Sequence, residues 1–252
     1  LNLWVGGQFY LWVRYYESGG EGWKVGRPPG VEGWLPIASL MNLKAWLFTG
    51  DVPAIHPAGM FLLSAFLVMS LIIPKSFCSW LCPVGTLSEA LHRFGHRLMG
   101  RNFEIPKWLD IPLRSIKYLL LGFFVYAVGM MSIEAIHGVL QGPYGIVADA
   151  RMLNFFRDLS LASILVIALL VLLSVFVKNF WCRYACPYGA LMGLVSLASP
   201  VRIRRNANLC IDCAKCSKAC PSLLPVDRLK VVRSPECTGC YECVSACPAD
   251  RA

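Results

Sequence analysis

The sequence predicts an α-helical membrane protein with about four transmembrane helices, an internal repeat and a small C-terminal α+β module. The first observation is composition, since 56% of the 252 residues are hydrophobic and only 15% are charged, unlike ordinary soluble domains. The second is a set of long uncharged apolar runs. The third is the placement of cysteine, because eight of the twelve cysteines follow residue 209. We therefore expect a transmembrane domain over 1–200 and a second domain over 201–252.

The apolar runs predict where the chain crosses the bilayer, which requires about 20 helical residues. The run Leu1–Val13 predicts the outer part of a first span, with an interfacial helix as the alternative. Residues 17–34 are rich in Gly and Pro and predict a loop. Leu35–Phe48 predicts an interfacial helix or a re-entrant segment. Lys117 is placed to snorkel at the start of the predicted span Tyr118–Ile133. Three further spans are predicted: Pro57–Ile73, Tyr118–Ile133 and Leu159–Val177.

Loop charges predict the orientation of these spans. Residues 74–117 hold seven Lys and Arg against three acids, and residues 178–252 hold eleven against five. The opposite loops are balanced, with four and four over 14–56 and two and three over 134–158. The positive-inside rule places the two basic segments on the cytoplasmic side. The net charge of +9 therefore indicates a lipid bilayer as partner and no nucleic acid.

The C-terminal region contains one cysteine motif twice, at an offset of 27 residues. The two copies are Cys210-x2-Cys213-x2-Cys216-x3-Cys220-Pro221 and Cys237-x2-Cys240-x2-Cys243-x3-Cys247-Pro248. In the bacterial two-cluster ferredoxin pattern, three cysteines hold one cluster and the fourth ligates the other. The predicted ligand sets are Cys210, Cys213, Cys216 and Cys247 for cluster 1, and Cys237, Cys240, Cys243 and Cys220 for cluster 2. Zinc sites and disulfides are the alternatives, but zinc sites need only paired Cys-x-x-Cys units. The spacing therefore predicts a bacterial two-[4Fe-4S] ferredoxin module.

The four remaining cysteines form a second pair of matching motifs, at an offset of 104 residues. The two copies are Cys78-x3-Cys82-Pro83 and Cys182-x3-Cys186-Pro187, each following an apolar run. This repeat predicts two membrane helices related by a pseudo-two-fold axis. In each motif proline suits the first turn of a helix, where its missing N–H is not needed. The preceding cysteine would then lie at a helix N-terminus, where the helix dipole favours a thiolate.

Three interpretations of these four cysteines are open. They ligate a third iron–sulfur centre together, they form disulfides or redox-active dithiols, or they are buried structural thiols. The third centre is favoured because the twelve cysteines divide into three sets of four and Cys-x3-Cys-Pro copies the end of the ferredoxin motif. The spacing does not distinguish a [4Fe-4S] from a [2Fe-2S] centre.

With both motif types present, the chain resembles the NapH/NosR/CcoG class of membrane-bound polyferredoxins from roughly the second span to the C-terminus. Four spans followed by the ferredoxin pair are most similar to the NapH-type branch. A NosR-type protein would add a large flavin-bearing domain, and a CcoG-type protein places its cluster module differently. The resemblance implies a bacterial inner (cytoplasmic) membrane protein, with its ferredoxin module on the cytoplasmic side. It also implies electron delivery from quinol to reductases, or metal reduction during oxidase assembly.

Histidines offer weaker candidate sites. His56 and His137 fall near predicted span ends, where they are candidates to contact a haem or a quinone. Capping or interfacial roles are commoner for such histidines, so haem is disfavoured and a quinone stays open. His92 and His96 lie four residues apart on a predicted basic helix over 87–101. Neighbouring arginines would repel a metal cation there, so a solvated face along lipid headgroups is favoured.

These observations predict a membrane-bound electron-transfer subunit of a larger oxidoreductase complex. Electrons would pass between a membrane quinone, or a partner redox subunit, and a partner at the cytoplasmic face. The alternative is a metal-reducing assembly factor that delivers electrons to copper or iron for a respiratory enzyme. A basic surface predicts docking of an acidic partner or a lipid headgroup. Its residues are Lys215, Lys218, Arg228, Lys230 and Arg233.

Overall fold

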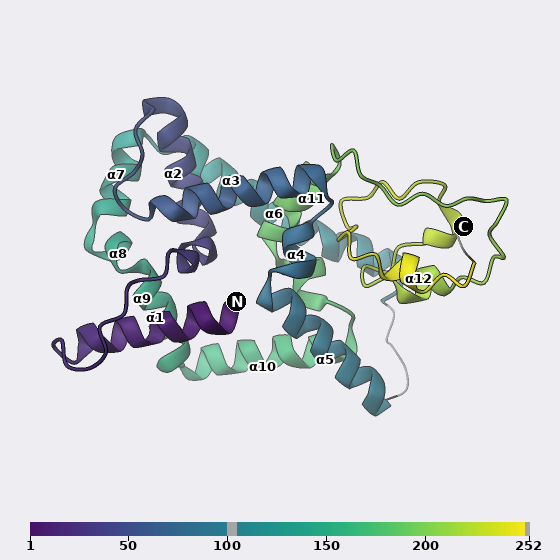
Figure 1. The fold of residues 1–252 in the computed structure, drawn as a ribbon, viewed down its shortest axis with the longest axis horizontal. Helices are drawn as coiled ribbons and strands as arrows, with labels where there is room; N and C mark the ends of the chain where they lie inside the picture. The colour runs from purple at the N-terminus through teal and green to yellow at the C-terminus, as the bar shows by residue number, and fades with distance from the viewer. Residues whose placement is uncertain (100–104, 250–252) are drawn as a thin grey trace. The chain divides into compact units, whose positions relative to one another are not determined.

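Helices dominate the computed structural model, which describes residues 1–99 and 105–249 (Figure 1). The chain divides into two compact units. Unit 1 comprises Leu1–Ala65 and Gly122–Ile164, and unit 2 comprises Phe66–Leu121 and Leu165–Ala252. All twelve cysteines therefore belong to unit 2. The predicted domain boundary after residue 200 stays a prediction, since unit 2 contains both sides of it.

Unit 1 is built from helices joined by turns and loops. Its elements are α1 (Asn2–Glu17), η1 (Pro29–Trp34), α2 (Pro36–Thr49), α7 (Ile133–Gln141), α8 (Pro143–Ile146) and α9 (Ala148–Arg157), with parts of α3 (Pro57–Ile72) and α6 (Lys107–Met130). The segment predicted as an interfacial helix or a re-entrant segment over 35–48 contains α2, which starts at a proline and has Gly50 as its C-cap in the left-handed conformation. The predicted loop over 17–34 contains the 3₁₀ helix η1. Two small apolar clusters, one around Phe9 and one around Ile136, hold these elements together.

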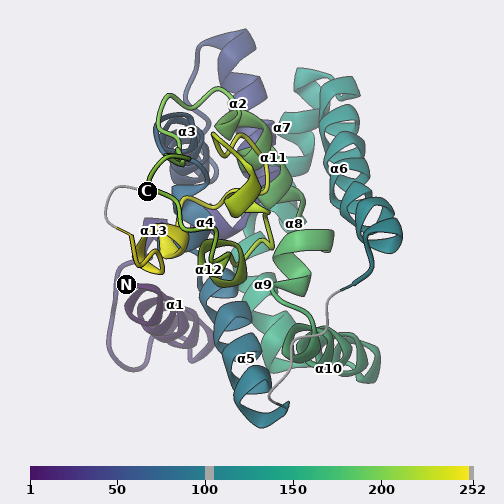
Figure 2. The same cartoon turned by 90° about the vertical axis from the view of Figure 1, so that its right-hand side faces the viewer.

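Unit 2 carries the cysteine motifs on short helices. Its elements are α4 (Ser76–Trp80), α5 (Pro83–Met99), α10 (Leu161–Phe176), the π-helical turn η2 (Trp181–Ala185), α11 (Pro187–Ser196), α12 (Lys215–Ala219), η3 (Val226–Arg228) and α13 (Glu242–Ser245). Its boundary with unit 1 falls inside α3, α6 and α10. In the C-terminal region α12 and α13 lie side by side (Figure 2). The β component there is one antiparallel bridge between Arg204 and Val231 in the described part of the chain.

The helices supply one or two candidate membrane spans within the described residues. In α6, Trp108–Met130 is long and apolar enough, and 11% of its apolar window is buried, unlike the core helix of a soluble protein. The helices α9 and α10 form a second candidate if they are one span, but they bend by 81°. The helix α3 is apolar but ends at Ile72, because Pro74 restricts the residue before it. The predicted total of four spans stays a prediction.

Close packing between α5 and α10 gives a test of unit 2. A Cβ atom at Gly95 would clash with the carbonyl oxygen of Val175 and lie 2.8 Å from its Cγ1. We expect Gly95→Ala to lower the free energy of unfolding by about 1–3 kcal/mol, because overpacking forces backbone shifts. Thermal unfolding in detergent, followed by circular dichroism, measures the effect. At Gly122 in α6 an added Cβ meets nothing within 4 Å, so Gly122→Ala should not destabilise. An equal loss in both variants would contradict this packing.

Candidate functional site

The two Cys-x3-Cys-Pro motifs begin with the same unusual backbone conformation. Lys75 and Asn179, 104 residues apart, have φ values of 44° and 52°. Non-glycine residues adopt this left-handed conformation at an energetic cost, so two occurrences at equivalent positions indicate a constrained turn. Each turn leads from an apolar helix into the first cysteine of its motif. The sequence repeat is therefore also a structural repeat.

The hydrogen bonds of the two motifs also match. The N–H of Cys82 donates to the carbonyl of Phe77 at 2.9 Å, and the N–H of Cys186 donates to the carbonyl of Trp181 at 3.0 Å. Both bonds span five residues, which widens the turn between the two cysteines of a motif. This wide turn places the second cysteine of each motif at the start of the following helix.

Proline begins the helix after each motif, as predicted. The helix α5 starts at Pro83 and α11 starts at Pro187. Cys186 is the N-cap of α11, and its sulfur accepts a hydrogen bond from the N–H of Gly189 at 3.3 Å. The prediction that these cysteines precede a helix N-terminus is confirmed. Unpaired N–H groups there favour an anionic sulfur.

The four motif cysteines come close enough for their charges to interact. Burial raises the pKa of the Cys78 thiol to about 12, against the charge of Lys75, and Cys186 and Cys82 add to the rise. Burial also raises the pKa of the Cys182 thiol, and the other three cysteines contribute. Thiolates at these positions therefore need a cation or a metal to stabilise them. All twelve cysteines lie in the described part of the chain, and each has a free thiol.

The C-terminal motifs repeat their backbone conformation as well. Asp212 and Ala214, on either side of Cys213, have φ values of 50° and 54°. At an offset of 27 residues, Gly239 and Tyr241 both have φ values of 60°. Left-handed residues on both sides of the middle cysteine curl each loop tightly. Two tight loops with the same curvature suit two similar clusters.

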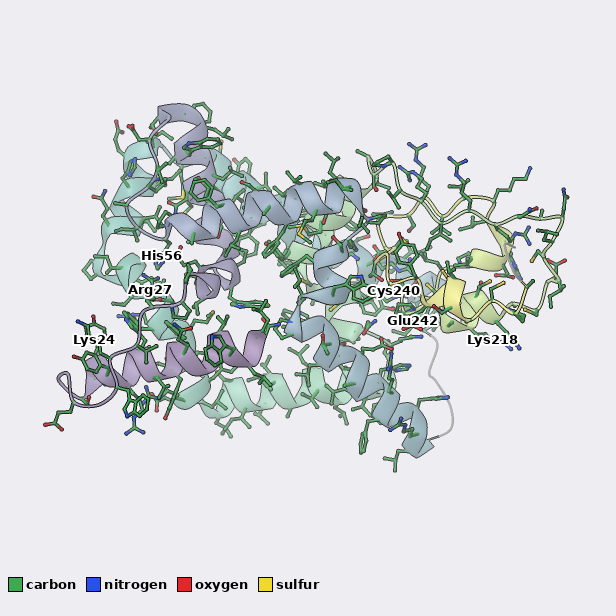
Figure 3. All side chains as sticks on the ribbon, viewed as in Figure 1. Lys24, Arg27, His56, Lys218, Cys240 and Glu242 are labelled. Carbon is green, nitrogen blue, oxygen red and sulfur yellow. The ribbon has the colours of Figure 1, made fainter. Side chains whose placement is uncertain are left out.

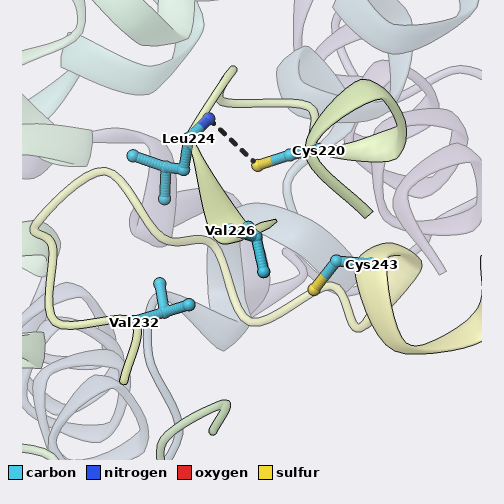
Figure 4. Close-up of a cluster of buried hydrophobic side chains, with 5 residues drawn as sticks. All are labelled: Cys220, Leu224, Val226, Val232 and Cys243. Atoms are coloured by element: carbon cyan, nitrogen blue, oxygen red, sulfur yellow. Dashed lines mark hydrogen bonds between the residues drawn. The ribbon is translucent and has the colours of Figure 1, made fainter. Parts of the chain in front are cut away.

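One cavity in the C-terminal region brings together four cysteines from both motifs. It is lined by apolar side chains and by Cys220, Cys237, Cys240 and Cys243. Figure 4 shows Cys220 and Cys243 around this space, with the N–H of Leu224 donating to the Cys220 sulfur at 3.5 Å. Burial raises the pKa of the Cys243 thiol to about 11, and the other three cysteines add to the rise. Four sulfur donors in an apolar shell are a donor set that fits a [4Fe-4S] cluster.

The other C-terminal set is more exposed to solvent. Cys213 is exposed, whereas Cys210, Cys216 and Cys247 are partly buried. The sulfur of Cys210 accepts a hydrogen bond from Arg205 Nη1 at 3.4 Å. In the described residues no three His, Cys, Asp or Glu side chains are close enough to bind one metal ion. A [4Fe-4S] cluster differs from such a site, because each cysteine binds a separate iron.

Buried ion pairs lie beside the cysteine motifs, and the sequence alone does not predict them. Lys117 is fully buried, and its Nζ lies 2.7 and 2.6 Å from the two carboxylate oxygens of Glu236. The hydroxyl of Tyr118 donates to the same carboxylate at 3.0 Å. The prediction that Lys117 snorkels to the interface is therefore wrong, because a buried carboxylate replaces water as its partner. No signal near either residue in the sequence indicates this pair, because the two residues lie 119 positions apart.

A second buried network joins α6 to the turn η2. Arg183 donates from Nε and Nη2 to the two carboxylate oxygens of Asp110, each at 3.0 Å. Tyr184 donates to Asp110 at 2.6 Å, and Arg114 also pairs with this carboxylate. Bidentate geometry and extra donors are the conditions under which a buried ion pair is well held. This network fixes the turn between Cys182 and Cys186.

The histidine candidates have different environments. His56 is 2% exposed, its Nδ1 lies 2.8 Å from Arg27 Nη2 and its Nε2 lies 2.9 Å from the carbonyl oxygen of Gly145 (Figure 3). Both ring nitrogens are therefore engaged within unit 1, and haem ligation would require one of these contacts to break. His137 is partly buried on α7.

The predicted basic helix over 87–101 corresponds to α5, while Arg101 lies outside the described residues. On this helix His92 is 4% exposed and His96 is exposed. The prediction of a solvated face is therefore wrong for His92, because α5 turns that side chain toward the interior. The same prediction agrees with the exposure of His96.

The fold and the cysteine sets define a class of iron–sulfur protein. The family described as "4Fe-4S binding domain" matches residues 55–102 and 159–206, which are 104 residues apart like the motifs. The family described as "4Fe-4S dicluster domain" matches residues 202–248. The chain belongs to the 4Fe-4S polyferredoxins of the class that includes NapH and NosR. The resemblance inferred from the sequence is confirmed.

Individual relatives cover different shares of the chain. It is 55% identical to YccM of Escherichia coli over 248 residues, which are 98% of this chain and 70% of YccM. The name of YccM assigns that protein to electron transport provisionally. The chain is 26% identical to the ferredoxin-type protein NapH of Escherichia coli, over 70% of this chain and 60% of NapH. It is 27% identical to the regulatory protein NosR of Pseudomonas aeruginosa, over 73% of this chain and 25% of NosR. No solved structure matches the chain.

The buried network around Asp110 gives a test of the site. We expect Asp110→Asn to lower the free energy of unfolding by about 3–5 kcal/mol, because it leaves Arg183 buried without its carboxylate. Thermal unfolding of the purified protein measures this loss. Asp51 is exposed, so Asp51→Asn is the matched control and should change stability by less than about 0.5 kcal/mol. Similar stability of the two variants would show that the network is not important for unit 2.

Proposed function

We propose that this chain is a membrane-bound electron-transfer subunit. It carries electrons between a membrane quinone, or a partner redox subunit, and a partner at the cytoplasmic face. The observation that carries the proposal is the placement of the cysteines, with four of them around one apolar cavity and four more at a second site of the same unit. The electron transport role given in the name of YccM supports the same conclusion.

The proposed ligand sets follow the motifs. Cluster 1 is held by Cys210, Cys213, Cys216 and Cys247, cluster 2 by Cys237, Cys240, Cys243 and Cys220, and a third centre by Cys78, Cys82, Cys182 and Cys186. Bound clusters supply reversible one-electron chemistry. The chain supplies sulfur ligands, N–H donors to sulfur, an apolar shell and buried cations. These are the features by which a protein sets a cluster's reduction potential.

The membrane part of the proposal rests on α6 and on charge. The first half of the candidate span Trp108–Met130 contains Asp110 and Lys117, which both pair within unit 2. This arrangement keeps the cysteine sets at one end of the helix. The basic excess of residues 74–117 and 178–252 supports a cytoplasmic location for that end in the bacterial inner membrane. A metal-reducing assembly factor gains no support from His56, since both of its ring nitrogens are engaged.

Iron content tests the number of centres. We expect protein purified without oxygen to contain about twelve iron atoms per chain, because three sets of four cysteines would hold three [4Fe-4S] clusters. Iron and acid-labile sulfide assays on the same sample measure this number. A value of about eight would remove the third centre and leave the C-terminal pair.

Loss of one motif cysteine tests the ligand sets. Cys82→Ala should lose about four iron atoms and retain the electron paramagnetic resonance (EPR) signals of the C-terminal pair, since Cys82 belongs to the third set. Cys237→Ala is the matched control and should instead remove a signal of that pair. If Cys82→Ala abolished the C-terminal signals and spared the rest, the proposed partition would be wrong.

A further inference from the structure

Lys75 is a buried cation at the contact between two cysteine sites. It is 3% exposed, and its carbonyl accepts the N–H of Cys78 at 2.9 Å. A Cβ atom at Gly193 would lie 2.7 Å from the Lys75 Cε and 3.0 Å from its Nζ, and would clash with the carbonyl oxygen of Pro235. The ammonium group therefore lies over Gly193, beside the backbone two residues before Cys237.

The surrounding loops are packed against each other. The hydroxyl of Ser79 donates to the carbonyl of Thr238 at 2.5 Å. A Cβ atom at Gly239 would lie 2.5 Å from the carbonyl oxygen of Pro74, so glycine is needed for this approach. The segment that carries Cys78 therefore contacts the loop between Cys237 and Cys240. Lys75 is fixed at this contact.

The charge of Lys75 acts on thiols of both sites. It interacts with Cys78, Cys182 and Cys186 of the Cys-x3-Cys-Pro motifs and with Cys237 of the C-terminal set. Lys178, which precedes Asn179 (the residue equivalent to Lys75 in the repeat), is 9% exposed and acts on Cys220. Of these two lysines, Lys75 is therefore the one whose charge acts on cysteines of both the Cys-x3-Cys-Pro motifs and the C-terminal set.

The buried charges near Lys75 do not balance. Lys75 and Lys117 both interact with the single carboxylate of Glu236, which Lys117 already pairs with directly. Asp110, on the same helix as Lys117, likewise faces two guanidinium groups, from Arg183 and Arg114. Excess buried positive charge is unfavourable unless an anion is close. A cluster with four thiolate ligands carries net negative charge and would supply that anion.

We propose that Lys75 compensates the negative charge of two iron–sulfur centres at once and raises the reduction potential of both. The two centres are those held by the Cys78 set and by the Cys237 set, so the inference rests on the proposed function. Reduction of a centre adds one electron and one negative charge. A cation fixed in apolar surroundings stabilises that reduced form, and the reduction potential rises with it.

Redox titration of the full chain with EPR detection tests this role. Three variants are compared: Lys75→Met, Lys75→Arg and Lys24→Met. In Lys75→Met the reduction equilibrium of both centres should shift at least tenfold toward the oxidised form, which is about 59 mV for a one-electron couple. The centre held by Cys213 and its partners should not shift. Lys75→Arg retains the charge and should stay within about threefold of the wild type. Lys24 is exposed and lies in unit 1, away from the cysteine motifs in the sequence, so Lys24→Met should leave all potentials unchanged.

The outcomes separate this inference from the proposed function. Unchanged potentials in Lys75→Met, with normal iron content, would overturn it. Equal shifts in the Met and Arg variants would overturn it too, because side-chain shape and not charge would then be responsible. Iron loss in Lys75→Met alone supports charge compensation, and iron loss in both variants opposes it. The iron content of the wild type tests the third centre independently, and the signal of the Cys237 set still reports on Lys75 if that centre is absent.

Discussion

The arrangement of unit 2 depends on the buried ion pair between Lys117 and Glu236. Lys117 belongs to the apolar helix α6, and Glu236 precedes a cysteine of the C-terminal motif by one residue. Both carboxylate oxygens contact the ammonium group, and Tyr118 supplies another donor. Burying either charge without its partner would cost several kcal/mol. The pair therefore holds the C-terminal loops at one position on α6, and the hydrogen bond from Ser79 to Thr238 joins the same loops to α4.

Features that depend on local sequence could be predicted well. The motif repeats at offsets of 27 and 104 residues reappear as matching backbone conformations, at Asp212 and Gly239 and at Lys75 and Asn179. Proline at the first position of α5 and α11 could also be predicted, because its missing N–H suits that position regardless of the rest of the fold. Cysteine spacing determines loop shape within a few residues. The family and the two motif types followed from the same local information.

Features that depend on distant residues could not be predicted. The pair between Lys117 and Glu236 joins residues 119 positions apart, and the pair between Arg183 and Asp110 joins residues 73 apart. A lysine at the end of an apolar run looks the same in sequence whether it reaches water or a buried carboxylate. The same holds for His56, since nothing nearby in sequence indicates the carbonyl of Gly145, 89 residues away. Charge burial is set by tertiary packing, which one sequence does not display.

The difference in exposure between the two C-terminal sets bears on how such a subunit would meet its partner. Cys220 and Cys243 are buried in an apolar core, whereas Cys213 is exposed. Electron exchange with another protein requires a close approach, which the exposed loop allows and the buried cavity does not. Lys215 and Lys218 are exposed beside that loop, and their charges would attract an acidic surface. Under the proposed ligand sets, the Cys213 set therefore faces the partner and the Cys237 set lies behind it. In this arrangement the proposed charge compensation by Lys75 acts on the inner Cys237 set and on the Cys78 set, which follows the apolar helices.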